Sequence, residues 1–122
     1  MRSLLTLTSV FEITTGLVLI AIPSVTVSLL LGPSLTEPSG MLVARIGGAA
    51  LITLAIACWL SRNDVQSSMV MIKALVFYNL AAALLLVYAG VVEHFSGMGL
   101  WPAALLHIGL LGWCIKSLLK KS

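Results

Sequence analysis

Long apolar runs separated by short polar breaks dominate the chain. Four runs are long enough to cross a bilayer, whose hydrocarbon core takes about 20 apolar residues as a helix. They cover residues 4–22, 41–60, 69–91 and 100–119. Backbone groups in lipid must be hydrogen-bonded within their own segment, so each run is predicted to be a helix. The alternating strands of about ten residues that build a membrane barrel do not occur in this pattern.

The breaks between the runs are too short for a separate soluble domain. The predicted fold class is therefore all-α, an integral membrane four-helix transmembrane bundle, with residues 1–122 as a single transmembrane domain. A helix over residues 4–31 would be about 42 Å long, which exceeds the core of about 30 Å. We therefore expect a break at Pro23 and a short interfacial segment over residues 24–31. One longer, tilted helix is the alternative.

The composition supports a membrane location and weakens other classes. Hydrophobic residues make up 60% of the 122 residues and charged residues 9%, whereas soluble domains carry about 25% charged residues. The net charge of +3 does not indicate nucleic-acid binding, because the cations sit at the ends of apolar runs and form no basic stripe. Cys58 and Cys114 lack metal-ligand or haem-attachment spacing, so they are expected to be buried reduced thiols, and no metal or cofactor is expected.

The N-terminal run is interpreted as a retained span. Arg2 followed by an apolar segment resembles the start of a signal peptide, but the run contains Glu12 and no clean cleavage site follows it.

The cations are distributed unevenly along the four predicted spans. All but Arg45 fall on one side of the membrane, namely Arg2, Arg62, Lys73, Lys116, Lys120 and Lys121. The positive-inside rule then predicts that both termini are cytoplasmic, and we expect a bacterial inner membrane. Trp59 and Trp113 fall at the predicted inner interface and Trp101 at the outer one, as aromatic belts prefer.

Each predicted span contributes one strongly polar side chain to the middle or outer half of the bilayer: Glu12, Arg45, Asn79 and His107. Glu12 and Asn79 are predicted near the centre, with Arg45 roughly 7 Å and His107 roughly 10 Å from the outer surface. Ionisable groups at such depths are costly unless paired, and they usually face the bundle interior. We therefore expect a central cluster in which Arg45 leans inward to pair with Glu12 while His107 and Asn79 complete the hydrogen bonds.

Small and hydroxyl residues at helical spacing indicate which faces point inward. The first span has Thr8, Glu12, Thr15 and Gly16 on one face, and the second has Arg45, Ala49, Thr53 and Ala57. Two interpretations of the cluster stay open. It is either a neutralised polar lock that fixes helix register, or the lining of an outward-facing pocket where Glu12 or His107 exchanges protons or Arg45 holds an anion.

The segment "FEITTG" and the overall hydropathy resemble the small multidrug resistance transporters, which have four helices and a glutamate midway along the first. This chain departs from that pattern. It has no tryptophan–glycine motif in the third span, its cation bias is strong, and it has three further intramembrane polar residues, Arg45, Asn79 and His107. No residue role is carried over from the resemblance.

The sequence names no substrate or reaction. We expect a small polytopic membrane protein, an accessory or self-associating module in membrane lipid, working as a homo-oligomer or in a larger membrane complex and not as an enzyme. The alternative is a small-solute or proton-coupled transporter or binding protein that uses the polar pocket. A redox or lipid-binding subunit is the third hypothesis. A bis-histidine haem is disfavoured, because His107 is the only histidine within a predicted span.

Overall fold

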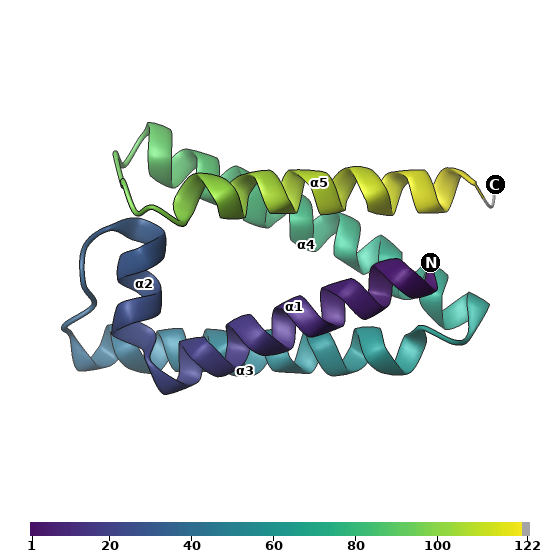
Figure 1. Cartoon of the computed structure of the whole chain (residues 1–122), viewed down its shortest axis with the longest axis horizontal. Coiled ribbons are helices and arrows are strands. Elements are labelled where there is room, and N and C mark those ends of the chain that lie inside the picture. The colour runs from purple at the N-terminus through teal and green to yellow at the C-terminus, as the bar shows by residue number, and fades with distance from the viewer. Residues whose placement is uncertain (121–122) are drawn as a thin grey trace.

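The computed structural model describes residues 1–120, and these are folded into helices joined by short loops (Figure 1). The helices are α1 (Arg2–Ala21), α2 (Pro23–Leu31), α3 (Pro38–Ser61), α4 (Val65–Val91) and α5 (Leu100–Leu119). All except α2 are long and apolar enough to cross a membrane. The predicted all-α, four-helix class is confirmed, and each expected span corresponds to one long helix to within about one turn. Lys121, one of the cations counted above, lies outside the described residues.

The four long helices form two antiparallel pairs, α1 with α3 and α4 with α5. Contacts within each pair are far more extensive than contacts between the pairs. Figure 1 shows α1 crossing α3 obliquely, with the α4–α5 pair beside them and with the start of α1 and the end of α5 at the same end of the molecule. We call this end the terminal end, and the opposite end, where α2 lies, the α2 end.

Two glycines allow α1 and α3 to approach each other backbone to backbone. A Cβ atom on Gly16 would lie 2.6 Å from the carbonyl oxygen of Gly48, and one on Gly48 would lie 2.7 Å from that of Gly16. Only glycine leaves room for this approach, and small residues at helix contacts serve the same purpose in membrane bundles. The Ser9 hydroxyl adds a hydrogen bond of 2.8 Å to the Ala55 carbonyl. These contacts fix the register of α1 against α3.

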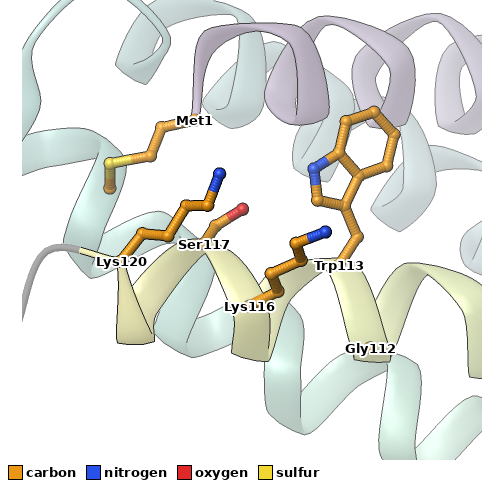
Figure 2. A pocket seen from close by; sticks show the side chains of 6 residues that line it. All are labelled: Met1, Gly112, Trp113, Lys116, Ser117 and Lys120. Carbon is orange, nitrogen blue, oxygen red and sulfur yellow. The ribbon is translucent and has the colours of Figure 1, made fainter.

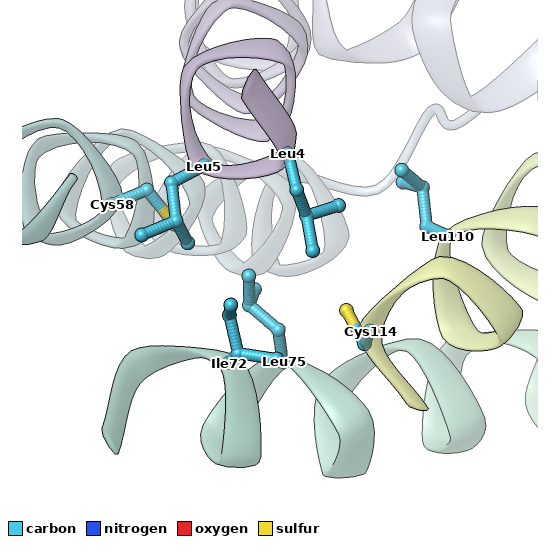
Figure 3. Packing of buried hydrophobic residues seen from close by; sticks show 7 residues of the cluster. All are labelled: Leu4, Leu5, Cys58, Ile72, Leu75, Leu110 and Cys114. Carbon is cyan, nitrogen blue, oxygen red and sulfur yellow. The ribbon is translucent and has the colours of Figure 1, made fainter. Parts of the chain in front are cut away.

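An apolar core joins the two pairs near the terminal end (Figure 3). All four long helices contribute to it, and its buried members are Leu4, Leu5, Cys58, Ile72, Leu75, Leu110 and Cys114. The two cysteines are free thiols and pack as small apolar side chains. The interior at this level is therefore mainly apolar side-chain packing, with a hydrogen bond of 2.7 Å from the buried Ser68 hydroxyl to the Ser61 carbonyl beside it.

The chain breaks between α1 and α2, as the proline predicted. Ile22 has the non-helical angles φ −133° and ψ 61°, and Pro23 opens α2 where its missing N–H costs nothing. The alternative of one tilted helix is therefore wrong. Figure 1 shows α2 lying across the long axis of the molecule at the α2 end.

The loop that precedes α5 completes the last turn of α2. A helix C-terminus leaves carbonyl groups without intrahelical partners. The amide of Gly99 donates to the Leu29 carbonyl at 2.8 Å, and the amide of Ser96 donates to that of Leu31 at 3.3 Å. A Cβ atom on Gly97 would lie 2.4 Å from the Leu30 carbonyl group, so the loop can pass this closely only with glycine there. Backbone hydrogen bonds therefore tie α2 to the α4–α5 pair.

A side-chain cap starts α4 at the terminal end. The Asp64 carboxylate accepts a hydrogen bond of 2.7 Å from the amide of Ser67. This is the usual role of an N-cap aspartate, which satisfies one of the free amides of the first turn. The same hydrogen bond holds the pKa of the Asp64 carboxyl below its ordinary value.

Candidate functional site

Glu12 lies in the interior between the two helix pairs. It is on α1, about two turns beyond the apolar core residue Leu4, and its side chain is only 1% exposed. The Tyr78 hydroxyl of α4 donates a hydrogen bond of 3.2 Å to its Oε2 atom. The buried carboxyl of one pair is thereby joined to a phenol of the other pair.

Asn79 and His107 connect α4 to α5. The Asn79 side-chain amide donates to the Leu75 carbonyl at 2.8 Å, and its Oδ1 lies 2.9 Å from His107 Nδ1. Because Oδ1 can only accept, this arrangement requires the proton of the imidazole to sit on Nδ1. Asn79 is fully buried and His107 is 8% exposed. The two side chains therefore form an oriented interhelical contact inside the α4–α5 pair.

Tyr78 links the two hydrogen-bonded contacts. Its ring meets the His107 ring edge to face, with centroids 5.6 Å apart and an interplanar angle of 84°. Glu12, Tyr78, Asn79 and His107 thus form one connected group, which we call the central polar cluster. It spans three helices and both pairs. A buried polar group is tolerated in lipid when its neighbours hydrogen-bond to it across the helix contact.

Two buried oxygen atoms of α1 have no hydrogen-bond partner: Glu12 Oε1 and Thr8 Oγ1. Their residues are one helical turn apart on the same face, and each is 1% exposed. An unsatisfied polar atom in an apolar interior costs about 1–3 kcal/mol. Thr8 and Glu12 therefore have hydrogen-bonding capacity that the described residues do not use.

The predicted ion pair between Glu12 and Arg45 is wrong. Arg45 is exposed, and its Nε donates to the Ile20 carbonyl at 3.3 Å. Within residues 1–120 no ion pair joins it to Glu12. The physical reason is the register of the pair: with Gly16 against Gly48, Arg45 lies level with the end of α1, about 12 Å along the axis from Glu12.

The predicted inward face of α3 is also wrong. Arg45, Ala49 and Thr53 are exposed and Ala57 is half-buried, whereas the buried residues of this helix are Gly48, Ala55 and Cys58. Successive residues are about 100° apart around a helix, so a predicted inward face that is wrong by one residue lies on a neighbouring side of the helix. On α1 the prediction and the structure agree for Thr8, Glu12 and Gly16, which are all buried.

Tyr78 is the main residue of the cluster that sequence reasoning did not select. It was one of two tyrosines within the third span, and nothing in its spacing distinguished it from Tyr88. Its one available signal was its position next to Asn79. Tyr88 instead donates to Glu93 at 3.1 Å in an exposed position.

The residues present do not form a metal centre. Among residues 1–120 there is no group of three or more His, Cys, Asp or Glu side chains that could hold a metal ion.

No protein-family model, curated protein or solved structure matches the chain. The helices alone define the class to which the chain belongs, that of small integral membrane proteins built as a helical bundle.

Proposed function

We propose that this protein is a small membrane module without catalytic activity that works by assembling with other membrane helices, either its own copies or a larger complex. The central polar cluster acts within it as a lock. The observation that supports the role of this cluster as a lock is that Glu12 is hydrogen-bonded to Tyr78 and His107 to Asn79, all inside the bundle. Polar contacts of this kind specify how helices meet in a medium where apolar packing alone discriminates little.

The lock fixes the position of one helix pair relative to the other. The two pairs share few contacts with each other, so their relative position depends on a small number of groups. The Tyr78–Glu12 hydrogen bond joins the pairs near mid-height, between the apolar core and the α2 contact. A slip of one pair along the other would leave the Glu12 carboxyl without its donor in an apolar interior, which is costly.

The outer face of α3 supports assembly with further helices. Ala49, Ala50 and Thr53 are exposed on it and carry small side chains, which permit close helix approach. Replacing Ala50 with Leu should weaken self-association while leaving the fold intact. Ala74→Leu is the matched control, because Ala74 is also exposed but lies on α4.

Single-molecule photobleaching in liposomes tests this proposal. The native chain should show oligomers whose population rises with the protein-to-lipid ratio, and Ala50→Leu should reduce that population while Ala74→Leu does not. A native chain that stays monomeric at every ratio, and that copurifies from its own membrane with no other protein, would contradict an assembly role.

We propose further that both termini face the cytoplasm of a bacterial inner membrane. Arg2 and Arg62 line one hollow at the terminal end, and Lys116 and Lys120 line another close by. The positive-inside rule favours the cytoplasm for such an end. A C-terminal fluorescent protein that requires the cytoplasm to mature should therefore be bright, and a C-terminal periplasmic phosphatase fusion should be inactive. The reverse result would overturn this orientation.

A second candidate function is a small-solute or proton-coupled transporter, which the two unpartnered oxygen atoms of Thr8 and Glu12 favour. A guest that supplied the missing hydrogen bonds would be stabilised there. Proton or solute flux into liposomes tests it: the native chain should show flux that Glu12→Gln abolishes and that Glu93→Gln, outside the helices, does not. Absence of flux, or flux unchanged by Glu12→Gln, excludes this candidate.

A further inference from the structure

A hollow of about 620 Å³ opens at the terminal end between the start of α1 and the last turns of α5 (Figure 2). It is lined by Met1, Gly112, Trp113, Lys116, Ser117 and Lys120. Apart from Met1, these residues belong to α5 or, for Lys120, cap its C-terminus. The hollow is separate from the central polar cluster and shares no residue with it.

The polar groups around this hollow are hydrogen-bond donors. Figure 2 shows the ammonium groups of Lys116 and Lys120, the hydroxyl of Ser117 and the indole nitrogen of Trp113 directed toward the same space. None of the lining residues carries a carboxylate. The two lysines are four residues apart on one helix face, where like charges repel each other. The chemistry of the hollow therefore fits an anion that accepts several hydrogen bonds.

Two neighbouring hollows at the same end differ in this respect. Lys73 shares its hollow with Asp64, and Arg2 and Arg62 share theirs with the same carboxylate. A carboxylate beside a cation offsets its charge and reduces its attraction for an external anion. Among the described residues, the lining of the hollow of Lys116 and Lys120 is distinguished by positive charge with no carboxylate beside it.

The apolar surface next to the hollow favours a lipid over a free anion. A Cβ atom on Gly112 or on Gly109 would meet nothing within 4 Å, so a strip of bare α5 backbone continues from the hollow toward the middle of the helix. Trp113 stands beside this strip and is 40% exposed. Tryptophan at such a position is typical of the membrane interface, where headgroups meet acyl chains.

We propose that this hollow binds the phosphate of an anionic phospholipid, with one acyl chain lying along Gly112 and Gly109. Lys116 and Lys120 supply the charge, and Ser117 and the Trp113 indole donate hydrogen bonds to the phosphate oxygens. Basic residues beside membrane helices recognise anionic headgroups in this way. The proposal is independent of the assembly role proposed above.

Quenching of Trp113 fluorescence by brominated lipids tests the site directly. Trp59→Phe and Trp101→Phe leave Trp113 as the only tryptophan of the chain. The protein is reconstituted in phosphatidylcholine vesicles that contain a small mole fraction of either brominated phosphatidylglycerol or brominated phosphatidylcholine. The brominated phosphatidylglycerol should quench more strongly at the same mole fraction, because it is enriched at the hollow.

Three variants separate the contributions to this preference. Lys116→Gln with Lys120→Gln should lower the apparent affinity for phosphatidylglycerol roughly fivefold per lysine. Lys73→Gln is the matched control and should leave the preference unchanged, because Lys73 lies in the hollow that contains Asp64. Gly112→Leu should weaken quenching by brominated phosphatidylglycerol, because the leucine side chain would cover the strip of bare α5 backbone along which the acyl chain lies. Circular dichroism checks that the helices are retained in this variant.

The outcomes that overturn the proposal are specific. Equal quenching by the two brominated lipids, or a preference that survives loss of both lysines, shows that the hollow does not select an anionic headgroup. If inorganic phosphate in the buffer abolishes the preference and Gly112→Leu leaves it intact, the hollow takes a free anion and not a lipid. A preference that withstands inorganic phosphate and is reduced by Gly112→Leu supports the lipid.

Discussion

The two helix pairs are held together by different means. In the α1–α3 pair, Gly16 and Gly48 bring the backbones into direct contact, and the polar side-chain links within the described residues are hydrogen bonds to backbone carbonyls, from buried Ser9 and from exposed Arg45. In the α4–α5 pair, the buried contact is a side-chain hydrogen bond between Asn79 and His107. A close backbone contact is weakened when a substitution adds side-chain volume, whereas a buried hydrogen bond is weakened when a substitution removes the donor or the acceptor. The pairs should therefore respond to opposite kinds of substitution.

Added volume at Gly48 should have the largest effect. Gly48→Ala places a methyl group 2.7 Å from the Gly16 carbonyl oxygen, so α1 must move away from α3. We expect a loss of about 3 kcal/mol in the free energy of unfolding, near the upper end for overpacking. Gly47→Ala is the matched control, because its methyl group would lie 3.7 Å from Leu19, an ordinary contact.

Unfolding in mixed micelles measures both glycine variants under the same conditions. Because both replace glycine with alanine in adjacent positions of α3, their difference reports the packing against α1 and not helix propensity. Equal stability of the two variants would show that the close approach of α1 and α3 does not hold this pair together.

Loss of a polar partner should matter more in the α4–α5 pair than in the α1–α3 pair. His107→Leu leaves the buried Asn79 Oδ1 without its donor, for which we expect a loss of about 1–2 kcal/mol. Ser9→Ala removes only a hydroxyl donor, and the average interhelical hydrogen bond in a membrane is worth about 0.6 kcal/mol. The same unfolding assay compares them, and a larger loss for Ser9→Ala would contradict the contrast between the pairs.

The Asp64 cap of α4, in the loop that connects the two pairs, should show the smallest effect, and one that depends on pH. Hydrogen bonding from Ser67 lowers the pKa of Asp64 in the folded state below its ordinary value of 3.8. A lowered pKa in the folded state stabilises the fold above the ordinary pKa, and this contribution is lost as the pH falls through the folded-state value. We therefore expect a small stability deficit for Asp64→Ala at neutral pH that shrinks in strong acid.

Comparison with Asp64→Asn separates charge from capping in that experiment. Asparagine is about as good an N-cap as aspartate, so this variant should retain most of the stability and lose the acid dependence. A deficit of Asp64→Ala that stays constant from neutral pH to well below 3.8 would show that the carboxylate charge contributes nothing at this cap.

The parts of the fold that follow from hydropathy were predictable, because lipid leaves the backbone few choices. The four spans and the break at Pro23 follow from run length and from one proline. The inward face of α1 was also predictable, since Thr8, Glu12 and Gly16 recur every four residues on one side and Glu12 is the only ionisable residue of this helix beyond Arg2.

The inward face of α3 could not be read from the same signal. Small residues occur all around this helix, for example Gly47, Gly48, Ala49 and Ala50 in succession, so their spacing does not single out one face. Only the contact with Gly16 selects Gly48. That contact also sets the register that separates Arg45 from Glu12, and sequence spacing within one helix carries no information on register between two helices.

A double-mutant cycle tests most directly whether Glu12 is joined to the second pair through Tyr78. Stability is measured for Glu12→Leu, Tyr78→Phe, Arg45→Gln and the two double variants that contain Glu12→Leu, because leucine removes the acceptor of the Tyr78 hydroxyl. We predict a coupling energy of about 0.6 kcal/mol or more between positions 12 and 78, and additive effects for positions 12 and 45. Coupling between 12 and 45, with additivity between 12 and 78, would contradict the arrangement described for the interior of this bundle.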